Sequence, residues 1–157
     1  MRSVDRVRDY FAQRGKNIEV KELSASTRTA QLAADAVGTP LGSIVKSLIV
    51  MANGHAILVL GAGDQRADVD KIAQCLGASD ARMANADQVR AATSYAIGGV
   101  PPVAHSTRLE TLIDQTLLRF DRVWAAAGAP NALFEIEMKI LLELTQGRVA
   151  DIVVTSA

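Results

Sequence analysis

Two glycines followed by two prolines mark the stretch whose residue types most clearly suggest chemistry, Tyr95-Ala-Ile-Gly-Gly-Val-Pro-Pro-Val-Ala-His105. Gly98 and Gly99 can adopt backbone angles closed to other residues and leave room for a ligand. Pro101 and Pro102 fix φ, remove two N–H donors and push the residue before each toward an extended conformation. We therefore expect a stiff loop whose exposed N–H groups at the glycine end cradle an anion or a polarised carbonyl. A tight connection between two elements is the alternative.

Lys46 is the second candidate, because it lies in the middle of an apolar, β-branched run from Ile44 to Met51. Alternation along a strand places its side chain on the same face as Ile44, Leu48 and Val50. Burial of an unpaired ammonium is costly. The side chain therefore either points into a polar pocket or lies at the rim of the sheet with its amine reaching water, and the sequence leaves both open.

The two histidines and the single cysteine add little to these candidates. His55 adjoins a turn and is expected at the surface, whereas His105 follows the proline loop and could reach a site. Cys75 lies beside an apolar helical stripe, as a small buried hydrophobe would. We find no Ser-His-Asp order, no P-loop and no metal-spaced ligand set, and Gly61-Ala-Gly63 is too short for a dinucleotide fingerprint. We expect no cofactor and no metal, so an enzyme of this kind would work by positioning and backbone electrostatics.

A hairpin is the clearest of the elements that would position these residues. The runs from Ile44 to Met51 and from His55 to Leu60 are joined by Asn53-Gly54. This dipeptide favours a type I′ turn, which needs positive φ at both positions. We therefore predict an antiparallel pair at the centre of a sheet, with Lys46 in its first strand.

The other elements follow from periodicity and capping residues. Helices are expected at 4–14 ending near Gly15, at 30–37 after a hydroxyl-rich segment, at 69–76 between Asp68 and Gly77, from the Asn85/Gln88 capping box to about Ala92, and at 137–145 ended by Gly147. Strands are expected at 17–23, 82–84, 111–114, 122–127, 132–136 and 149–154, with a turn at 128–131. The irregular mixture favours an α/β (α+β) fold with a mixed, mostly antiparallel central sheet packed by helices, in a single domain covering 1–157.

Composition limits the possible partners. Seventeen basic and seventeen acidic residues give a formal net charge of zero, whereas proteins that coat nucleic acid are usually basic. We therefore expect no DNA partner, although a pocket could still grip one end of an RNA. The N-terminus lacks the apolar region of a secretory signal, and no run approaches eighteen apolar residues. These features, with only one cysteine, predict a cytoplasmic protein without membrane contact.

Several segments together resemble the YbaK/ProX family, whose stand-alone or appended domains hydrolyse mischarged aminoacyl-tRNA. The matching segments, in order, are Thr27-Arg-Thr-Ala-Gln-Leu-Ala-Ala34, Ile44-Val-Lys-Ser-Leu48, Val59-Leu-Gly-Ala-Gly-Asp64, Tyr95-Ala-Ile-Gly-Gly-Val-Pro-Pro102, Asp114 and Val149-Ala-Asp-Ile152. No single motif is specific, but the ordered set is, and it covers roughly residues 17 to 153. The resemblance implies the editing-domain fold of the YbaK and prolyl-tRNA synthetase type.

The resemblance also implies catalytic positions. The lysine of the family matches Lys46, which would contact the terminal adenosine end of the substrate or its ester carbonyl. The Gly-x-x-x-Pro loop of the family matches Gly98 to Pro102. In this loop Gly98 and Gly99 would act in catalysis, and Val100, Pro101 and Pro102 would hold the aminoacyl ester and position a water molecule. The 2′-hydroxyl of the tRNA is thought to assist in this family, which would account for the absence of a protein nucleophile.

The remaining implied positions concern substrate binding. Thr27, Thr29, Gly128 and Asn131 match regions that shape the amino-acid pocket. His105 and Asp114 are further substrate-binding candidates, although a capping role for Asp114 stays equally open. Many relatives carry His in place of Asn131, and some carry Asp in place of Phe134, so these departures put the identity of the amino acid in doubt rather than the reaction.

Three functions follow from this sequence. The first is a trans-editing aminoacyl-tRNA deacylase that acts on the acceptor end of mischarged tRNA, such as Cys- or Ala-tRNA(Pro), with a prolyl-tRNA synthetase as an expected protein partner. The second is a non-catalytic tRNA- or nucleotide-binding regulatory module of the same fold. The third is a hydrolase of small-molecule esters. Retention of both Lys46 and the complete proline loop favours the first over the second.

Overall fold

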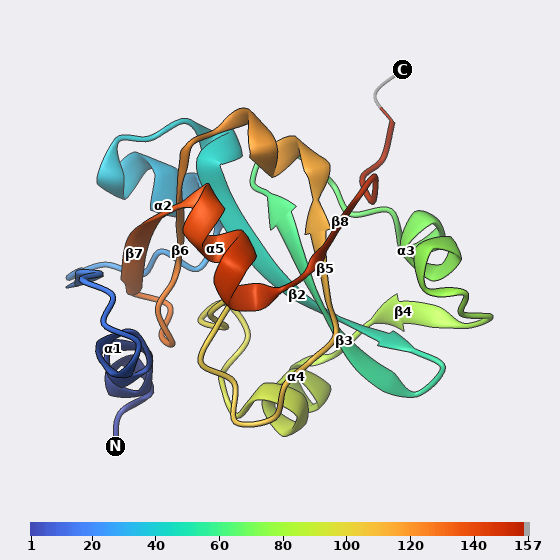
Figure 1. The fold of residues 1–157 in the computed structure, drawn as a ribbon, viewed down its shortest axis with the longest axis horizontal. Coiled ribbons are helices and arrows are strands. Elements are labelled where there is room, and N and C mark those ends of the chain that lie inside the picture. Colours follow the sequence, from blue (N-terminus) through green and yellow to red (C-terminus); the bar gives the residue numbers. More distant parts are fainter. Residues whose placement is uncertain (156–157) are drawn as a thin grey trace.

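The computed structural model describes residues 1–155, which are organised around one mixed sheet in the order β1-β7-β6-β2-β3-β5-β8, with β4 beside β2 (Figure 1). The strands are β1 Val20–Glu22, β2 Ile44–Ala52, β3 His55–Ala62, β4 Ala81–Met83, β5 Thr111–Asp114, β6 Arg122–Ala126, β7 Ala132–Glu137 and β8 Arg148–Ala150. The pairs β1–β7, β2–β3, β2–β4 and β6–β7 are antiparallel, and β2–β6, β3–β5 and β5–β8 are parallel. The predicted mixed, mostly antiparallel sheet is confirmed.

The β2–β3 hairpin lies at the centre of this sheet, as predicted. Its ladder is continuous from Val45 opposite Ala62 to Ala52 opposite His55. Asn53 and Gly54 have φ of 49° and 81°, the two positive values that a type I′ turn requires. The long hairpin gives the sheet a rigid central pair of strands, and Lys46 is in the first of them.

The helices begin and end close to the predicted boundaries. They are α1 Ser3–Gln13, α2 Ala30–Val37, α3 Val69–Leu76, α4 Ala86–Thr93 and α5 Met138–Thr145, with short 3₁₀ helices η1 Leu41–Ser43 and η2 Gln115–Arg119. The side chains of Thr29, Asp68 and Asn85 accept hydrogen bonds from backbone N–H groups in the first turns of α2, α3 and α4. The Gln88 side chain accepts a hydrogen bond from the Asn85 N–H, which completes a capping box. No helix within residues 1–155 is long and apolar enough to cross a membrane.

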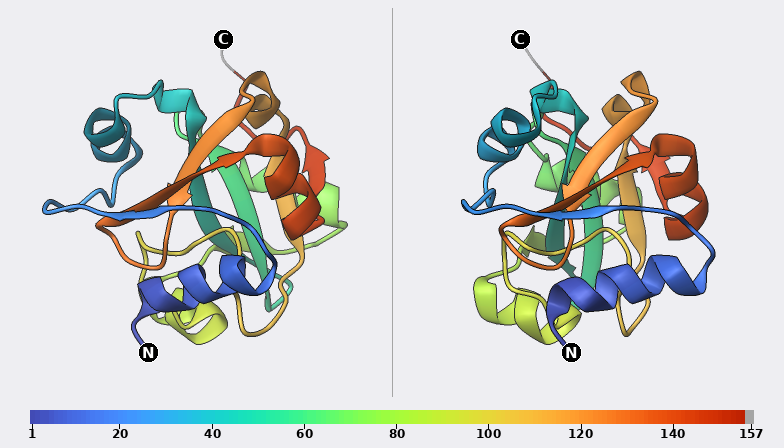
Figure 2. Two further views of the ribbon diagram at one scale, coloured as in Figure 1. Left: turned by 60° about the vertical axis from the view of Figure 1, so that its left-hand side comes forward. Right: turned by 90° about the vertical axis from the view of Figure 1, so that its left-hand side faces the viewer.

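The two faces of the sheet are covered by different helices. Leu58 and Leu60 pack into a core that contains Phe11 of α1 and Leu141 of α5. The alternate β3 residues pack instead against Ile72 of α3, and α2 covers Ile44 and Trp124 through small residues. In the side view of Figure 2, α2 lies on one side of the strands and α5 on the other. An extended segment after α1 runs back across the molecule to β1 and then to α2 (Figure 2).

Two predicted strand boundaries and one predicted helix-terminating residue are wrong. The last strand was expected at 149–154, but β8 ends at Ala150, and beyond it Val153 forms only an isolated bridge with Ala67. The reason is that β8 pairs with β5, which ends where Asp114 caps η2. The first strand is shorter than 17–23 because β7 pairs only with Val20–Glu22. Helix α5 ends in a left-handed Gln146, whereas Gly147 packs so closely on Ile113 that a Cβ would lie 2.8 Å from it.

Candidate functional site

A split in the sheet borders a cavity. Strand β6 pairs with β2 only at Ile44 and Val45, and β4 joins the same edge of β2 only from Val50 onward. Between these points the strand edge is open from Lys46 to Leu48, and the Ile49 carbonyl accepts the Ala84 N–H at 2.9 Å. A cavity of about 390 Å³ lies there, called here the β2–β6 cavity, lined by residues 27–30, Ala33, residues 44–48, Ile97, Gly98, Val100, Ala126 and Leu133. This volume falls within the range of about 300–1,000 Å³ of small-molecule sites.

Lys46 is half-buried in the wall of this cavity. Its Nζ donates a hydrogen bond to the Gln65 carbonyl at 2.5 Å. Burial lowers the pKa of Lys46, and the nearby carboxylates of Asp114 and Asp64 partly oppose that shift. The Lys46 side chain borders the cavity, but its ammonium group is hydrogen-bonded to Gln65, which does not line the cavity. The side chain leans over β3, where a Cβ on Gly61 would lie 4.0 Å from the Lys46 Cε, and it supplies a positive charge with limited hydration.

Two carboxylates stand behind Lys46 and do not line the cavity. Asp114 is fully buried and accepts hydrogen bonds from the Ala62 N–H at 3.0 Å and from the Thr116 N–H and hydroxyl, both at 2.8 Å. It therefore caps η2 and influences Lys46 only through its charge. Asp64 accepts two hydrogen bonds from Arg119, at 3.0 and 2.7 Å, and this guanidinium holds the pKa of the Asp64 carboxyl below its ordinary value.

The glycine end of the proline loop forms a second side of the cavity. Gly98 has φ of 87°, and a Cβ there would lie 3.2 Å from the Cβ of Arg28. The Gly99 N–H already donates to the Ala96 carbonyl at 3.0 Å, and a Cβ on Gly99 would lie 2.9 Å from the Ala129 backbone. The amides of Gly98 and Val100 have no hydrogen-bond acceptor within residues 1–155. Gly98 and Val100 therefore supply the free donors, whereas Gly99 allows close packing.

The proline end of the loop faces away from Lys46. His105 donates from Nε2 to the Pro101 carbonyl at 2.7 Å, and the Tyr95 hydroxyl donates to the Ala104 carbonyl at 2.6 Å. The Tyr95 and His105 rings meet edge to face, with their centroids 5.6 Å apart. Burial lowers the pKa of His105 and raises that of Tyr95. Pro102 and His105 line a different cavity, so these two residues brace the loop from behind.

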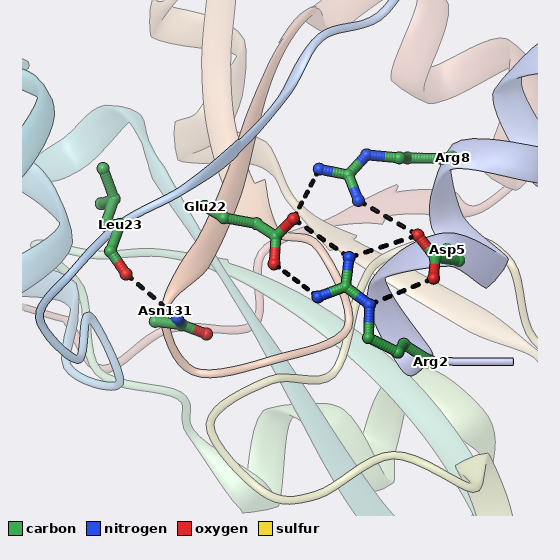
Figure 3. A network of polar contacts seen from close by, with 6 residues as sticks. All are labelled: Arg2, Asp5, Arg8, Glu22, Leu23 and Asn131. Atoms are coloured by element: carbon green, nitrogen blue, oxygen red, sulfur yellow. Dashed lines mark hydrogen bonds and ion pairs between the residues drawn. The ribbon is translucent and has the colours of Figure 1, made fainter.

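The outer wall of the cavity is the segment from Leu23 to Thr29, and the turn 128–131 holds it in place. The Thr27 N–H and hydroxyl both donate to the Pro130 carbonyl, at 2.6 and 2.7 Å. Leu23 and Asn131 exchange hydrogen bonds, the Leu23 N–H to the Asn131 carbonyl at 2.7 Å and the Asn131 side-chain amide to the Leu23 carbonyl at 3.0 Å (Figure 3). Asn131 and its turn therefore lie behind the wall, and Thr27 and Thr29 form its inner surface.

A cluster of ion pairs fastens α1 to the same region. Glu22 accepts from Arg2 at 3.0 Å and from Arg8 at 2.8 Å, and Asp5 bridges the same two arginines (Figure 3). Hydrogen bonds from these arginines lower the pKa of the Glu22 carboxyl. Gly128 approaches α1 so closely that a Cβ would lie 2.7 Å from the Ser3 carbonyl. Helix α1, β1 and the turn 128–131 thus form one support for the wall.

The comparison with known families gives this geometry a context. Residues 24–144 match the family model described as the aminoacyl-tRNA editing domain. The chain belongs to the aminoacyl-tRNA editing family. That match includes the wall segment, the strand that carries Lys46 and the proline loop, so every side of the β2–β6 cavity lies within the editing domain.

Individual relatives agree with this assignment. A crystal structure described as a candidate trans-editing enzyme for prolyl-tRNA synthetase is 45% identical, covers 98% of both chains and superposes with a TM-score of 0.91. The Bacillus subtilis protein YwhH is 34% identical over 94% of each chain. EbsC of Enterococcus faecalis, described as a candidate Cys-tRNA(Pro)/Cys-tRNA(Cys) deacylase, is 26% identical over 79% of this chain and 76% of its own. The predicted family and its fold are thereby confirmed.

The editing domain gathers only part of the predicted site in one place. Thr27, Thr29, Lys46, Gly98 and Val100 line the β2–β6 cavity. The other predicted positions, Gly99, Pro101, Pro102, His105, Asp114, Gly128 and Asn131, do not line this cavity and support those that do. Phe134 lies in the core against Phe11, with ring centroids 5.0 Å apart. Within residues 1–155 no cluster of three or more histidine, cysteine or acidic side chains could hold a metal ion.

Sequence reasoning missed Ser47, Arg28 and Ile97, which also line the cavity. The Ser47 hydroxyl is buried without a hydrogen-bond partner. The Gly63 N–H bonds to the Ile44 carbonyl, so Ser47 occupies a non-hydrogen-bonded position opposite Leu60. Its N–H and C=O therefore point away from β3, toward the open strand edge. A hydroxyl beside a lysine in an apolar strand was the available signal.

Proposed function

We propose that this editing domain is an aminoacyl-tRNA deacylase that acts in trans on the acceptor end of mischarged tRNA(Pro), with Cys or Ala as the amino acid removed. The observation that carries the proposal is that one cavity is lined by Lys46 and by Gly98 and Val100, whose amides have no hydrogen-bond acceptor within residues 1–155. The family assignment supports the same reaction class.

The chemistry is hydrolysis of the ester that joins an amino acid to the terminal ribose. Water adds to the carbonyl carbon, negative charge develops on the carbonyl oxygen, and the C–O bond to the ribose breaks as that ribose oxygen takes a proton. Lys46 and the free loop amides would stabilise the developing oxyanion without having to reorganise. The neighbouring 2′-hydroxyl of the substrate would orient the water molecule, so no protein nucleophile is required.

The walls of the cavity favour a small aminoacyl group. Ala30, Ala33 and Ala126 present single methyl groups, and Ser47 adds a hydroxyl. An apolar pocket separates substrates that differ by one methylene by only about 1–3 kcal/mol. Discrimination between Cys and Ala would therefore depend on a polar contact with the Cys thiol. The Ser47 hydroxyl, which has no hydrogen-bond partner, is the group proposed to make that contact.

The balance of charge fits a protein that holds only the end of its tRNA. The net charge is zero, and Arg28 at the cavity mouth has no carboxylate partner within residues 1–155. This guanidinium would meet a phosphate near the terminal adenosine. Selection of tRNA(Pro) would then come from a prolyl-tRNA synthetase or another tRNA-binding partner.

The test is deacylation of labelled Cys-, Ala-, Ser- and Pro-tRNA(Pro) by the parent protein and by Lys46→Ala and Lys46→Met. The methionine retains most of the apolar stem, so it separates loss of charge from loss of packing. We expect rapid loss of one misacylated species with the parent and loss of activity in both variants. Lys139→Ala is the matched control, because it removes an exposed lysine of α5 outside the cavity.

Folding of each variant is checked by its circular dichroism spectrum and melting temperature. Survival of the whole panel in the presence of the parent, with retained tRNA binding, would overturn the proposal in favour of a non-catalytic binding module. Faster cleavage of free amino-acid esters than of charged tRNA would instead indicate a small-molecule esterase.

A further inference from the structure

A second cavity lies behind the proline loop and contains none of the groups proposed to contact the ester. It has a volume of about 210 Å³ and is bordered by α1, the end of the loop, the start of β5 and the end of α5. Gly98 and Val100 line the β2–β6 cavity, whereas Pro102, Val103, Ala104 and His105 line this second one. The same short loop therefore separates two hollows, called here the front and the rear cavity, the front one being the β2–β6 cavity.

The rear cavity is positively charged. Arg14 and Arg108 line it, and no acidic residue does. Neither arginine pairs with a carboxylate within residues 1–155. The Arg14 guanidinium lies 3.6 Å from the Tyr10 ring centroid and donates to the Tyr10 carbonyl, and Arg108 donates to the Gln146 side chain at 3.0 Å. Both guanidinium groups keep donors to spare, because each has five N–H groups.

The helix ends at this cavity do not cancel its charge. Helices α1 and α5 both terminate beside it, at Gln13 and Thr145. Each helix C-terminus is equivalent to about half a negative charge. Two such ends offset only one of the two guanidinium charges. Apolar side chains of Leu58, Val103, Leu109 and Leu144 complete the walls and offer an anion no competing carboxylate.

We propose that the rear cavity is a binding site for a phosphate-type oxyanion, held by Arg14 and Arg108. A guanidinium presents parallel N–H donors that match the spacing of phosphate oxygens. The volume suits a phosphate group with a small attached moiety rather than a whole nucleotide. The group can come from a free phosphorylated metabolite or from the backbone of an RNA, and these two sources are separated by experiment below.

His105 connects this site to the proline loop. Its Nε2 donates to Pro101, whose carbonyl can only accept, so in the neutral ring Nδ1 carries no proton. Nδ1 is buried without a partner. Burial lowers the pKa of His105. An oxyanion nearby would favour the imidazolium and raise that pKa, so binding takes up a proton and strengthens as the pH falls.

The other charged and titratable groups around His105 would not take up a proton when an anion binds. The cavity itself adds Tyr10, Arg14 and Arg108, the ring of Tyr95 packs against the imidazole, and Glu110 lines a neighbouring hollow with Arg108. The arginines keep their charge throughout the accessible range. His105 is thus the residue lining the cavity whose protonation an oxyanion would change most readily.

The experiment follows the ring protons of His105 by NMR as a function of pH. The chain has two histidines, so a His55→Gln background leaves one signal, and His55 is exposed at the hairpin turn. Sodium sulfate is the probe because its charge is constant in this range, with sodium chloride at equal ionic strength as the control. We expect sulfate, and not chloride, to raise the pKa of His105. Calorimetry with sulfate should give an affinity that increases as the pH is lowered.

Two variants test whether Arg14 and Arg108 hold the anion. Arg14→Gln and Arg108→Gln should each weaken sulfate binding by about tenfold or more, because a charge-assisted hydrogen bond contributes about 1.5–3 kcal/mol. Arg66→Gln, which changes an exposed arginine outside the cavity, should leave binding unchanged. Equal pKa values in sulfate and chloride, or undiminished binding in both cavity variants, would overturn the proposal.

The source of the phosphate is decided by competition. A short single-stranded RNA and a small phosphate monoester are each added to the sulfate-loaded protein. Displacement by the RNA assigns the site to a backbone phosphate, and displacement by the monoester alone assigns it to a free metabolite. Failure of both to displace sulfate would count against a phosphate site.

Discussion

Lys46 is charged at a place where a neutral side chain would be less costly to bury, and the proposed chemistry depends on that charge. The sequence predicted its importance because a lysine in an apolar strand needs an explanation. The sequence could not predict Arg28 or Ile97 as cavity residues, because their positions depend on a break between two strand pairings far apart in the chain. Only Ser47 carried a local signal, a hydroxyl beside that lysine.

The pH dependence of deacylation tests the role of Lys46. Burial lowers the pKa of this ammonium, so the protonated form is lost at a lower pH than for an exposed lysine. After subtraction of spontaneous hydrolysis, kcat/KM should fall as the pH rises through that pKa. Residual activity of Lys46→Arg should lack this decline, since a guanidinium stays charged. A decline of the same shape in both proteins would assign the titration to another group.

His105 has a positioning role that a substitution series can isolate. His105→Ala removes the donor to the Pro101 carbonyl and should lower kcat by about fivefold to tenfold, the equivalent of one neutral hydrogen bond of about 1–1.5 kcal/mol. His105→Gln keeps an N–H donor in a similar place and should recover most of the rate. Steady-state kinetics of both variants measure kcat and KM separately. Equal loss in the two variants would mean that the ring contributes through packing alone.

At the scale of elements, local chemistry predicted more than long-range pairing did. The hairpin, the helix caps and most strands follow from turn and capping residues that act over a few positions. The parallel pairing of β2 with β6 and its end at Val45 do not, because they depend on contacts between segments about eighty residues apart. The same reason explains the short β8, whose length is set by β5 rather than by its own apolar residues.

The hairpin turn gives a direct test of the central pair of strands. Gly54 has φ of 81°, and nothing lies within 4 Å of the position that a Cβ would occupy. Gly54→Ala should therefore lower the free energy of unfolding by about 1–2 kcal/mol, through backbone strain alone. Gly54→Asn should cost less, because asparagine tolerates this conformation. Urea denaturation measures both, and an equal cost for the two variants would contradict a strained turn.

At the scale of the whole molecule, zero net charge predicts a weak electrostatic contribution to tRNA binding. If only Arg28 and a few neighbours meet phosphates, the plot of log K against log salt concentration should have a slope no steeper than about −3, as expected for roughly four contacts to a single strand. Filter binding of deacylated tRNA between low and moderate salt measures this slope. A much steeper slope would mean that the protein contacts the tRNA well beyond its acceptor end.

The attachment of the outer wall has a consequence for substrate entry. Segment 23–29 is tied to the turn 128–131 by hydrogen bonds of Leu23 and Thr27, and it lies outside the strands of the central hairpin. Such a segment can detach locally at a much lower free energy than global unfolding requires. We therefore expect the Thr27 amide to exchange with deuterium far faster than the amides of Leu58 and Leu60 in β3. Comparable protection at all three positions would mean that the wall opens only with the sheet.

Fast exchange at Thr27 would show that the wall opens locally while Lys46, in the central hairpin, stays in place. Admission of the aminoacyl end would then be controlled by the lifetime of the open wall, independently of the hydrolytic step. Substitutions in the turn 128–131, remote from the ester, would alter how quickly substrates enter and products leave. Relatives that differ at Asn131 would in that case differ in residence time as well as in the side chain they accept.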